Sequence, residues 1–254
     1  MSQLQIHNNY LTQIVVLYLE AKSAKGSKLM FVNQGIAQIR RNYEQYGNES
    51  NTMVLFIANY SKGQINETKK AIEQYGATLI LVNSAQDFIE YINNGNDRQN
   101  DKITNMTIFS HGLPGSIDFG YGLSEYATSY KLDKSNVSKL RDSAFKGSKS
   151  SIMSYACRSG LGPGYGVLDF DSENSIAQLM ANSTKTNVGA FLVKTDYSNT
   201  LGNVFQRRIG NATSQYETVD NAILTPHGAL SPVIGGSTPW YYLPLPQLFK
   251  PQNR

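Results

Sequence analysis

Cysteine and histidine are scarce in this chain of 254 residues, which has one cysteine and three histidines. A single cysteine excludes an internal disulfide and any site that binds a metal through several cysteines, and it leaves the redox compartment open. The histidines are scattered and form no His-Glu-X-X-His motif, so a zinc hydrolase is not indicated. We therefore expect no metal and no other cofactor.

Long apolar runs and dense clusters of one charge are also missing. The apolar run 14–19 is far too short to cross a bilayer, and residues 1–9 lack the basic start and apolar core of a signal peptide. The net charge is only +4 and the basic pairs are isolated, which does not favour nucleic-acid binding. We expect a soluble protein that binds neither nucleic acid nor membrane, and that is cytoplasmic or exported without an N-terminal signal peptide.

The composition is that of a globular protein, with 40% hydrophobic and 17% charged residues. From residue 53 onward, short apolar runs alternate with segments of helical periodicity. This alternation predicts an α/β fold with a mainly parallel sheet flanked by helices on both faces. The predicted strands are 53–60, 78–82, 105–110, 150–156 and 188–195. The predicted helices are 64–75, one that begins at Ser84, 135–144 and 173–185.

We interpret the chain as one domain over 1–254 with its core at 53–197. In the N-terminal extension, 1–52, residues 10–20 and 28–33 are interpreted as a hairpin that is followed by a helix. That helix places on one face Ile36, Ile39 and Tyr43. The C-terminal extension, 198–254, turns to glycine, proline and polar residues and is expected to be irregular.

Two of the predicted strands lead into residues that can act as a nucleophile and its base. Strand 105–110 is followed by His111 and Gly112, and strand 150–156 by Cys157. In parallel α/β sheets the ligand crevice lies outside the carboxyl ends of the strands, so both side chains should face one crevice. A free thiol, with a pKa of about 8.5, is mostly protonated at neutral pH, and an imidazole can take its proton. Cys157 and His111 are therefore the candidate catalytic residues.

The segment Tyr155-Ala-Cys-Arg-Ser-Gly160 resembles the Gln-Ala-Cys-X-Gly signature of caspases, and His111 precedes it at a similar spacing. Tyr155 stands in place of the caspase glutamine, and Ser159 intervenes before the glycine. The resemblance is therefore to the wider group of caspase-like (clan CD) cysteine peptidases, which includes legumains, clostripain, gingipains and the self-processing domains of bacterial toxins. It covers roughly residues 53–197.

This resemblance implies a three-layer, caspase-hemoglobinase-like sandwich and a cysteine endopeptidase that cleaves a polypeptide substrate, as a self-processing domain or a toxin-like effector. The backbone amides of Gly112 and Cys157 would then form the oxyanion hole. In similar peptidases the pocket for the substrate P1 residue draws on the end of the strand after the nucleophile, which here carries Asp196. A carboxylate there favours a basic P1 residue. The alternatives for this role are Asp118, Asp169 and Asp171.

Other functions remain open on the sequence. A catalytically silent caspase-like domain would act as a binding scaffold, and an unrelated α/β domain would bind a nucleotide or another small molecule at the same crevice. The glycine-rich stretch 160–166 lacks the Lys-Ser/Thr of a phosphate loop, so we interpret it as a substrate loop. A serine hydrolase is not indicated, because no Gly-X-Ser-X-Gly motif occurs. The sequence does not indicate whether the protein forms oligomers.

Overall fold

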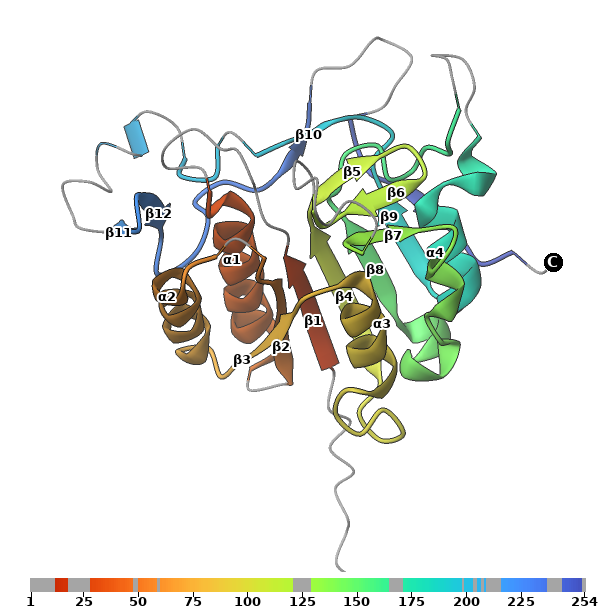
Figure 1. Cartoon of the computed structure of the whole chain (residues 1–254), viewed down its shortest axis with the longest axis horizontal. Helices are drawn as coiled ribbons and strands as arrows, with labels where there is room; N and C mark the ends of the chain where they lie inside the picture. Colours follow the sequence, from red (N-terminus) through yellow and green to blue (C-terminus); the bar gives the residue numbers. More distant parts are fainter. Residues whose placement is uncertain are drawn as a thin grey trace, which may run out of the picture.

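A seven-stranded sheet forms the centre of the protein (Figure 1). The structure, a computed structural model, describes residues 12–17, 28–47, 50–58, 60–120, 129–164, 171–197, 199–202, 205–206, 208, 216–236 and 244–252. From one edge to the other, the strands are β14 (Gln247–Phe249), β9 (Asn187–Ala190), β8 (Ser151–Ser154), β4 (Ile103–Phe109), β1 (Thr12–Leu17), β2 (Asn51–Phe56) and β3 (Thr78–Val82). All neighbouring pairs are parallel except β14 with β9, so the predicted mainly parallel sheet is confirmed.

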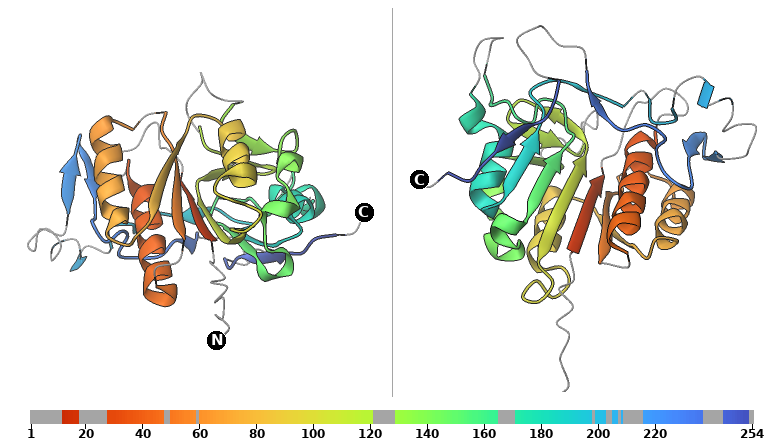
Figure 2. Two further views of the ribbon diagram at one scale, coloured as in Figure 1. Left: turned by 90° about the horizontal axis from the view of Figure 1, so that it is seen from below. Right: turned by 180° about the vertical axis from the view of Figure 1, so that it is seen from behind.

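Helices cover both faces of this sheet. Helices α1 (Met30–Tyr46) and α2 (Lys62–Glu73) pack together on one face, and α3 (Ala85–Asn94) and α4 (Ile176–Thr184) lie on the other (Figures 1 and 2). Right-handed crossovers require this division, because the chain moves one way along the sheet from β1 to β3 and the other way from β4 to β9. The α/β fold class and its three layers are therefore confirmed.

Local sequence signals fix where the helices begin. Ser61 and Gln64 form a reciprocal capping box at the start of α2, with the Gln64 amide donating to the Ser61 hydroxyl over 3.1 Å. At α3, the Ser84 hydroxyl accepts a hydrogen bond from the Asp87 amide over 3.0 Å. The apolar residues of α3 that are spaced i, i+3, i+4 and i+7 are all buried: Ala85, Phe88, Ile89 and Ile92.

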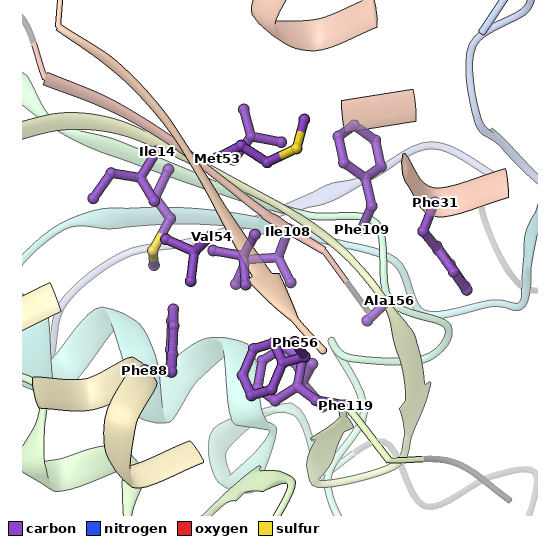
Figure 3. Close-up of a cluster of buried hydrophobic side chains, with 14 of the residues drawn as sticks. Ile14, Phe31, Met53, Val54, Phe56, Phe88, Ile108, Phe109, Phe119 and Ala156 are labelled. Atoms are coloured by element: carbon purple, nitrogen blue, oxygen red, sulfur yellow. The ribbon is translucent and has the colours of Figure 1, made fainter. Parts of the chain in front are cut away.

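The hydrophobic core lies on both sides of the sheet. Figure 3 shows Phe56, Phe88 and Phe119 on one side and Met53 and Phe109 on the other. The rings of Phe56 and Phe119 stack with centroids 4.1 Å apart. Strand β2 is buried along its whole length, as expected for an internal strand of a parallel sheet covered on both faces.

The predicted N-terminal hairpin is wrong. Residues 12–17 form β1, which lies between β2 and β4 and pairs with both in parallel, and residues 28–33 include the first turn of α1. An apolar run that is buried on both faces suits the centre of a sheet better than an exposed hairpin. The sheet thus takes its central strand from before residue 53, and its edge strand β14 from beyond residue 197.

The predicted helix at 135–144 is also wrong, since the segment forms two 3-10 turns, η2 (Val137–Lys139) and η3 (Asp142–Ala144). Side chains of other elements bond to carbonyls of this segment that a continuous α-helix would use for its own hydrogen bonds. Asn93 Nδ2 donates to the Lys139 carbonyl over 2.8 Å, and Ser183 Oγ donates to the Leu140 carbonyl over 2.7 Å. Three apolar residues of this segment are nevertheless buried: Val137, Leu140 and Ala144.

Two further predictions were correct in place but not in extent. The predicted helix at 173–185 is divided into the 3-10 turn η5 (Ser172–Asn174) and α4. The predicted strand at 188–195 ends early, and its last residues form β10 (Thr195–Asp196), which pairs with β13 (Ile234–Gly235). The remaining short elements are β5 (His111–Leu113), β6 (Ser116–Asp118), β7 (Lys131–Asp133), η4 (Gly147–Lys149), β11 (Glu217–Val219) and β12 (Ala222–Leu224).

Candidate active site

His111 begins a small three-stranded sheet, β5-β6-β7, at the carboxyl end of β4 (Figure 1). The hairpin between β5 and β6 closes through Pro114 and Gly115, and Gly115 has φ of 80°. Proline followed by a glycine with positive φ is typical of the central positions of a type II turn. The amide of Gly115 also donates to the Leu161 carbonyl over 2.7 Å, which ties this hairpin to the loop that follows Cys157.

Cys157 lies in a tight turn just beyond β8. The turn runs from Ala156 to Ser159, with Arg158 in the left-handed region at φ of 53°. The buried Ser159 hydroxyl donates to the Ala156 carbonyl over 2.9 Å and lies 3.0 Å from Ser154 Oγ. The serine that interrupts the caspase-like signature therefore has a physical role here, because it fastens the turn that presents the thiol.

The two candidate catalytic segments lie against each other. Ile108 of β4 pairs with Ser154 of β8, so His111 and Cys157 lie equally far beyond one register pair on adjacent parallel strands. A Cβ atom on Gly112 would overlap the Cys157 carbonyl oxygen and lie 2.9 Å from Ala156 Cβ. Glycine at 112 is thus required by the close approach of the Cys157 turn, a reason that the sequence did not reveal.

The half-buried thiol is held by Thr195 of β10. The Thr195 amide donates to Cys157 Sγ over 3.2 Å, and Thr195 Oγ1 also lies 3.2 Å from the sulfur. The same hydroxyl donates to the Tyr155 carbonyl over 2.7 Å. Because the only hydroxyl proton of Thr195 is used in that bond, the thiol and not the hydroxyl is the donor between Sγ and Oγ1. The thiol has a second, more distant acceptor in the Thr195 carbonyl, 3.7 Å from Sγ.

Aromatic side chains connect the two strand ends. The buried Tyr197 donates its hydroxyl proton to the Tyr155 carbonyl over 2.9 Å, and its oxygen accepts a hydrogen bond from the Ser110 amide. Phe31, in the first turn of α1, makes edge contacts with the rings of His111 and Tyr197 at centroid distances of 5.1 and 4.5 Å. Tyr197 thus bridges the ends of β4 and β8, which carry the two candidate catalytic residues.

Burial dominates the electrostatics of the site. It lowers the pKa of His111 to about 4, since removal from water disfavours the imidazolium. The imidazole is therefore neutral at pH 7 and can accept a proton, although the same burial makes it a weaker base than an exposed histidine. Burial raises the pKa of Tyr197 well above its usual value, so its hydroxyl stays protonated and keeps its donor role.

No known family model matches this chain. No curated protein matches it in sequence either. The assignment of the site therefore rests on its geometry and on the residues themselves.

The structure shows how the two backbone amides of the predicted oxyanion hole, those of Gly112 and Cys157, are placed for donating a hydrogen bond. Gly112 pairs with Ile117, next to the pair that closes the hairpin. Such a position is not hydrogen-bonded in an antiparallel ladder, so the Gly112 N–H points away from β6. Within the described part of the chain, the Cys157 amide has no backbone acceptor.

The acidic candidates for substrate binding occupy different positions. Asp196 follows the residue that contacts the thiol, but Thr195 and Tyr197 both point toward the Tyr155 carbonyl, so strand alternation directs Asp196 to the other side of β10. Asp118 lies opposite His111 in register, yet its carboxylate accepts from the Gly120 amide over 2.9 Å and lies 3.8 Å from Lys131 Nζ. Burial raises the pKa of this carboxyl.

The remaining candidates lie elsewhere. Asp171 accepts hydrogen bonds from the Asn174 amide and side chain and so caps η5. Asp169 and His7 fall outside the described residues, as do Tyr165 and Gly166 at the end of the predicted substrate loop. His227 bonds the Tyr75 hydroxyl over 2.8 Å, close to α2 and away from Cys157.

Within the described ranges, no group of three or more His, Cys, Asp or Glu side chains could hold a metal ion, and no helix is long and apolar enough to cross a membrane. Two of the pockets are lined entirely by residues that the structure describes. One, of about 550 Å³, lies beside Arg98 and Arg141, and the other, of about 490 Å³, lies along β14. Neither includes His111 or Cys157.

Sequence reasoning missed three residues of this site: Phe31, Thr195 and Tyr197. Phe31 was assigned to the false hairpin. Thr195 and Tyr197 were recognised only as residues at the end of the predicted strand that carries Asp196. A hydroxyl residue and a tyrosine two positions apart in an extended segment share one side, and that spacing is the only local signal that they act together.

Proposed function

We propose that this protein is a cysteine endopeptidase with Cys157 as the nucleophile and His111 as its base. The observation that carries the proposal is the packing of His111-Gly112 against the Ala156–Cys157 turn, at the carboxyl ends of two adjacent parallel strands. A structural cysteine and a structural histidine have no physical need to share this position. Ligand crevices of parallel α/β sheets form at these ends of the strands.

The neutral imidazole suits the first step of such a reaction. His111 would take the proton of the Cys157 thiol, and the sulfur would attack the carbonyl carbon of the peptide bond. The Gly112 and Cys157 amides would donate to the oxygen that becomes negative. His111 would then give its proton to the departing amine, and water would hydrolyse the thioester. No metal takes part in these steps, so we expect cleavage to persist in EDTA.

The decisive experiment is cleavage of a peptide library varied at P1 by the wild type and by Cys157→Ala. We expect Cys157→Ala to lose cleavage completely and His111→Ala to lose at least about a thousandfold in kcat/KM, because nucleophile and base act as one unit. His227→Ala is the matched control, since it removes a histidine remote from the thiol, and it should retain full activity. Cleavage that survives in Cys157→Ala would rule out this assignment, and a folded wild type that cleaves no peptide would favour the scaffold alternative.

For specificity we retain a basic P1 residue as the proposal, with Asp196 as its partner. Strand alternation directs the Asp196 carboxylate to the side of β10 away from the thiol, which weighs against direct contact with a P1 side chain beside Cys157. If Asp196 binds P1, Asp196→Ala should lower kcat/KM for P1 Arg and Lys more than tenfold and leave thiol alkylation unchanged. An unchanged P1 preference would remove Asp196 from the site without affecting the catalytic pair.

One observation favours a second candidate, an α/β domain that binds a small ligand. Counting only the strands of the main sheet in chain order, they are arranged 3-2-1-4-5-6-7, and the first six follow the order of dinucleotide-binding folds. However, the segment between β1 and α1, residues 18–29, has only one glycine and lacks the Gly-X-Gly-X-X-Gly fingerprint. This candidate predicts thermal stabilisation by a nucleotide and alkylation of Cys157 that does not depend on His111.

A further inference from the structure

The contacts of Cys157 assign a role to Thr195 that no motif indicates. Two groups of Thr195 lie 3.2 Å from the sulfur, its amide and its hydroxyl oxygen. The amide can only donate, so it favours a negative sulfur. The hydroxyl can donate or accept, and at present its proton goes to the Tyr155 carbonyl at 2.7 Å. Whether the Thr195 hydroxyl donates a hydrogen bond to the sulfur or accepts one from it therefore depends on whether the thiol is protonated.

We propose that Thr195 is a hydroxyl switch that stabilises the thiolate of Cys157, an inference that rests on the proposed peptidase function. In the thiol state, the S–H proton is donated to Thr195 Oγ1 at 3.2 Å, which is nearer than the Thr195 carbonyl at 3.7 Å. When that proton moves from Sγ to the imidazole of His111, the sulfur becomes negative. The lone pairs of Thr195 Oγ1 then point at a negative sulfur and repel it. Rotation about the Cβ–Oγ1 bond removes this repulsion, because the hydroxyl proton turns from the Tyr155 carbonyl to the sulfur. The thiolate then accepts two hydrogen bonds from one residue.

The site already contains the group that allows this rotation. The Tyr155 carbonyl accepts a second hydrogen bond, from the Tyr197 hydroxyl over 2.9 Å. It therefore keeps a donor when Thr195 turns away, and no carbonyl is left without a partner. Tyr197 is a positioning residue in this scheme, since it acts through Tyr155 and Thr195 and does not depend on contact with the sulfur.

Alkylation of Cys157 by iodoacetamide, measured from pH 5 to pH 10, tests the switch. Thr195→Val keeps the amide and the branched shape but removes the hydroxyl. We expect the alkylation profile to move to higher pH and the rate at pH 7 to fall about tenfold, the size expected for one hydrogen bond to an ionised group. Thr195→Ser should restore the wild-type profile. Thr68→Val is the matched control, because Thr68 is also buried and also donates to a carbonyl, but lies on α2.

Tyr197→Phe provides a second test if Thr195→Val does not fold. Without the tyrosine hydroxyl, the Tyr155 carbonyl would hold the Thr195 proton more firmly, so the profile should move in the same direction by a smaller amount. A Thr195→Val profile that superimposes on the wild type in a folded protein would overturn the switch. If the wild type cleaves peptides and that profile is unchanged, only the switch fails. If the profile shifts and no peptide is cleaved, the peptidase function fails instead.

Discussion

The two ends of the central sheet treat buried polar groups differently. At the amino ends of the strands, hydroxyl side chains fasten the backbone, as Ser150 does by donating to the Ile103 carbonyl over 2.8 Å and accepting from the Lys146 amide over 2.7 Å. At the carboxyl ends, the Thr195 hydroxyl is shared between a carbonyl and a sulfur, and an imidazole is held where burial lowers its pKa. The first arrangement stabilises the fold, whereas the second places the proposed catalytic pair at some cost in stability.

Two glycines at opposite ends of the sheet provide the strongest test of this contrast. Gly112→Ala should cost about 3 kcal/mol or more of unfolding free energy, because the new methyl group meets the backbone of the Cys157 turn. Gly147→Ala, before β8, meets no atom within 4 Å and should cost only about 1 kcal/mol for its φ of 62°. Urea unfolding measures both. Equal costs would show that the Cys157 turn yields easily, contrary to the packing described here.

The pH dependence of stability should come from the carboxyl end. The pKa of His111 is about 4 in the folded protein and near 6.5 when unfolded, so protonation favours the unfolded chain. Stability from this residue is fully present above pH 6.5 and is lost as the pH falls through 4, by up to about 3 kcal/mol. His111→Gln should remove this loss between pH 7 and pH 4, measured by urea unfolding at each pH. A mutant as acid-sensitive as the wild type would mean that the imidazole is well solvated.

The smallest effects concern two buried serines, Ser159 at the carboxyl end and Ser150 at the amino end. Each serine hydroxyl donates to a carbonyl, so Ser159→Ala and Ser150→Ala should each cost about 1–2 kcal/mol of unfolding free energy. Only Ser159→Ala should also slow alkylation of Cys157, because it loosens the turn that presents the thiol. Equal alkylation rates in the two variants would separate the turn from the reactivity of the thiol.

Local patterns predicted most of the sheet but not its centre. Strands 53–60, 78–82 and 105–110 were recognised because apolar runs and helical segments alternate, and Ser61 and Ser84 mark helix starts whose chemistry is local. The run 14–19 is equally apolar, but its sequence does not tell which partners it meets, and β2 and β4 come much later in the chain. The helix predicted at 135–144 failed for a similar reason, since the bonds from Asn93 and Ser183 are long-range.

In the candidate site, too, the residues that could be predicted depend on local patterns, and those that could not depend on contacts between distant parts of the chain. His111 and Cys157 could be predicted as neighbours because each follows a strand, and parallel strands end at one edge of the sheet. The contact of Thr195 with the thiol could not, because it depends on β9 ending at Ala190 and on the chain returning to pair with β13. The glycine at 112 was recognised, but its steric reason lies in a turn more than forty residues further along the chain.

The central place of β1 also bears on when the proposed catalytic site can form during synthesis. This strand leaves the ribosome before both of its neighbours, and its second neighbour, β4, is the strand that leads into His111. The thiol partner at Thr195 is made later still, and the edge strand β14 comes last. Contacts between distant parts of a chain form slowly, so a nascent chain exposes Cys157 well before its surroundings exist. The contacts that surround Cys157 are therefore complete only once nearly all of this sheet has emerged.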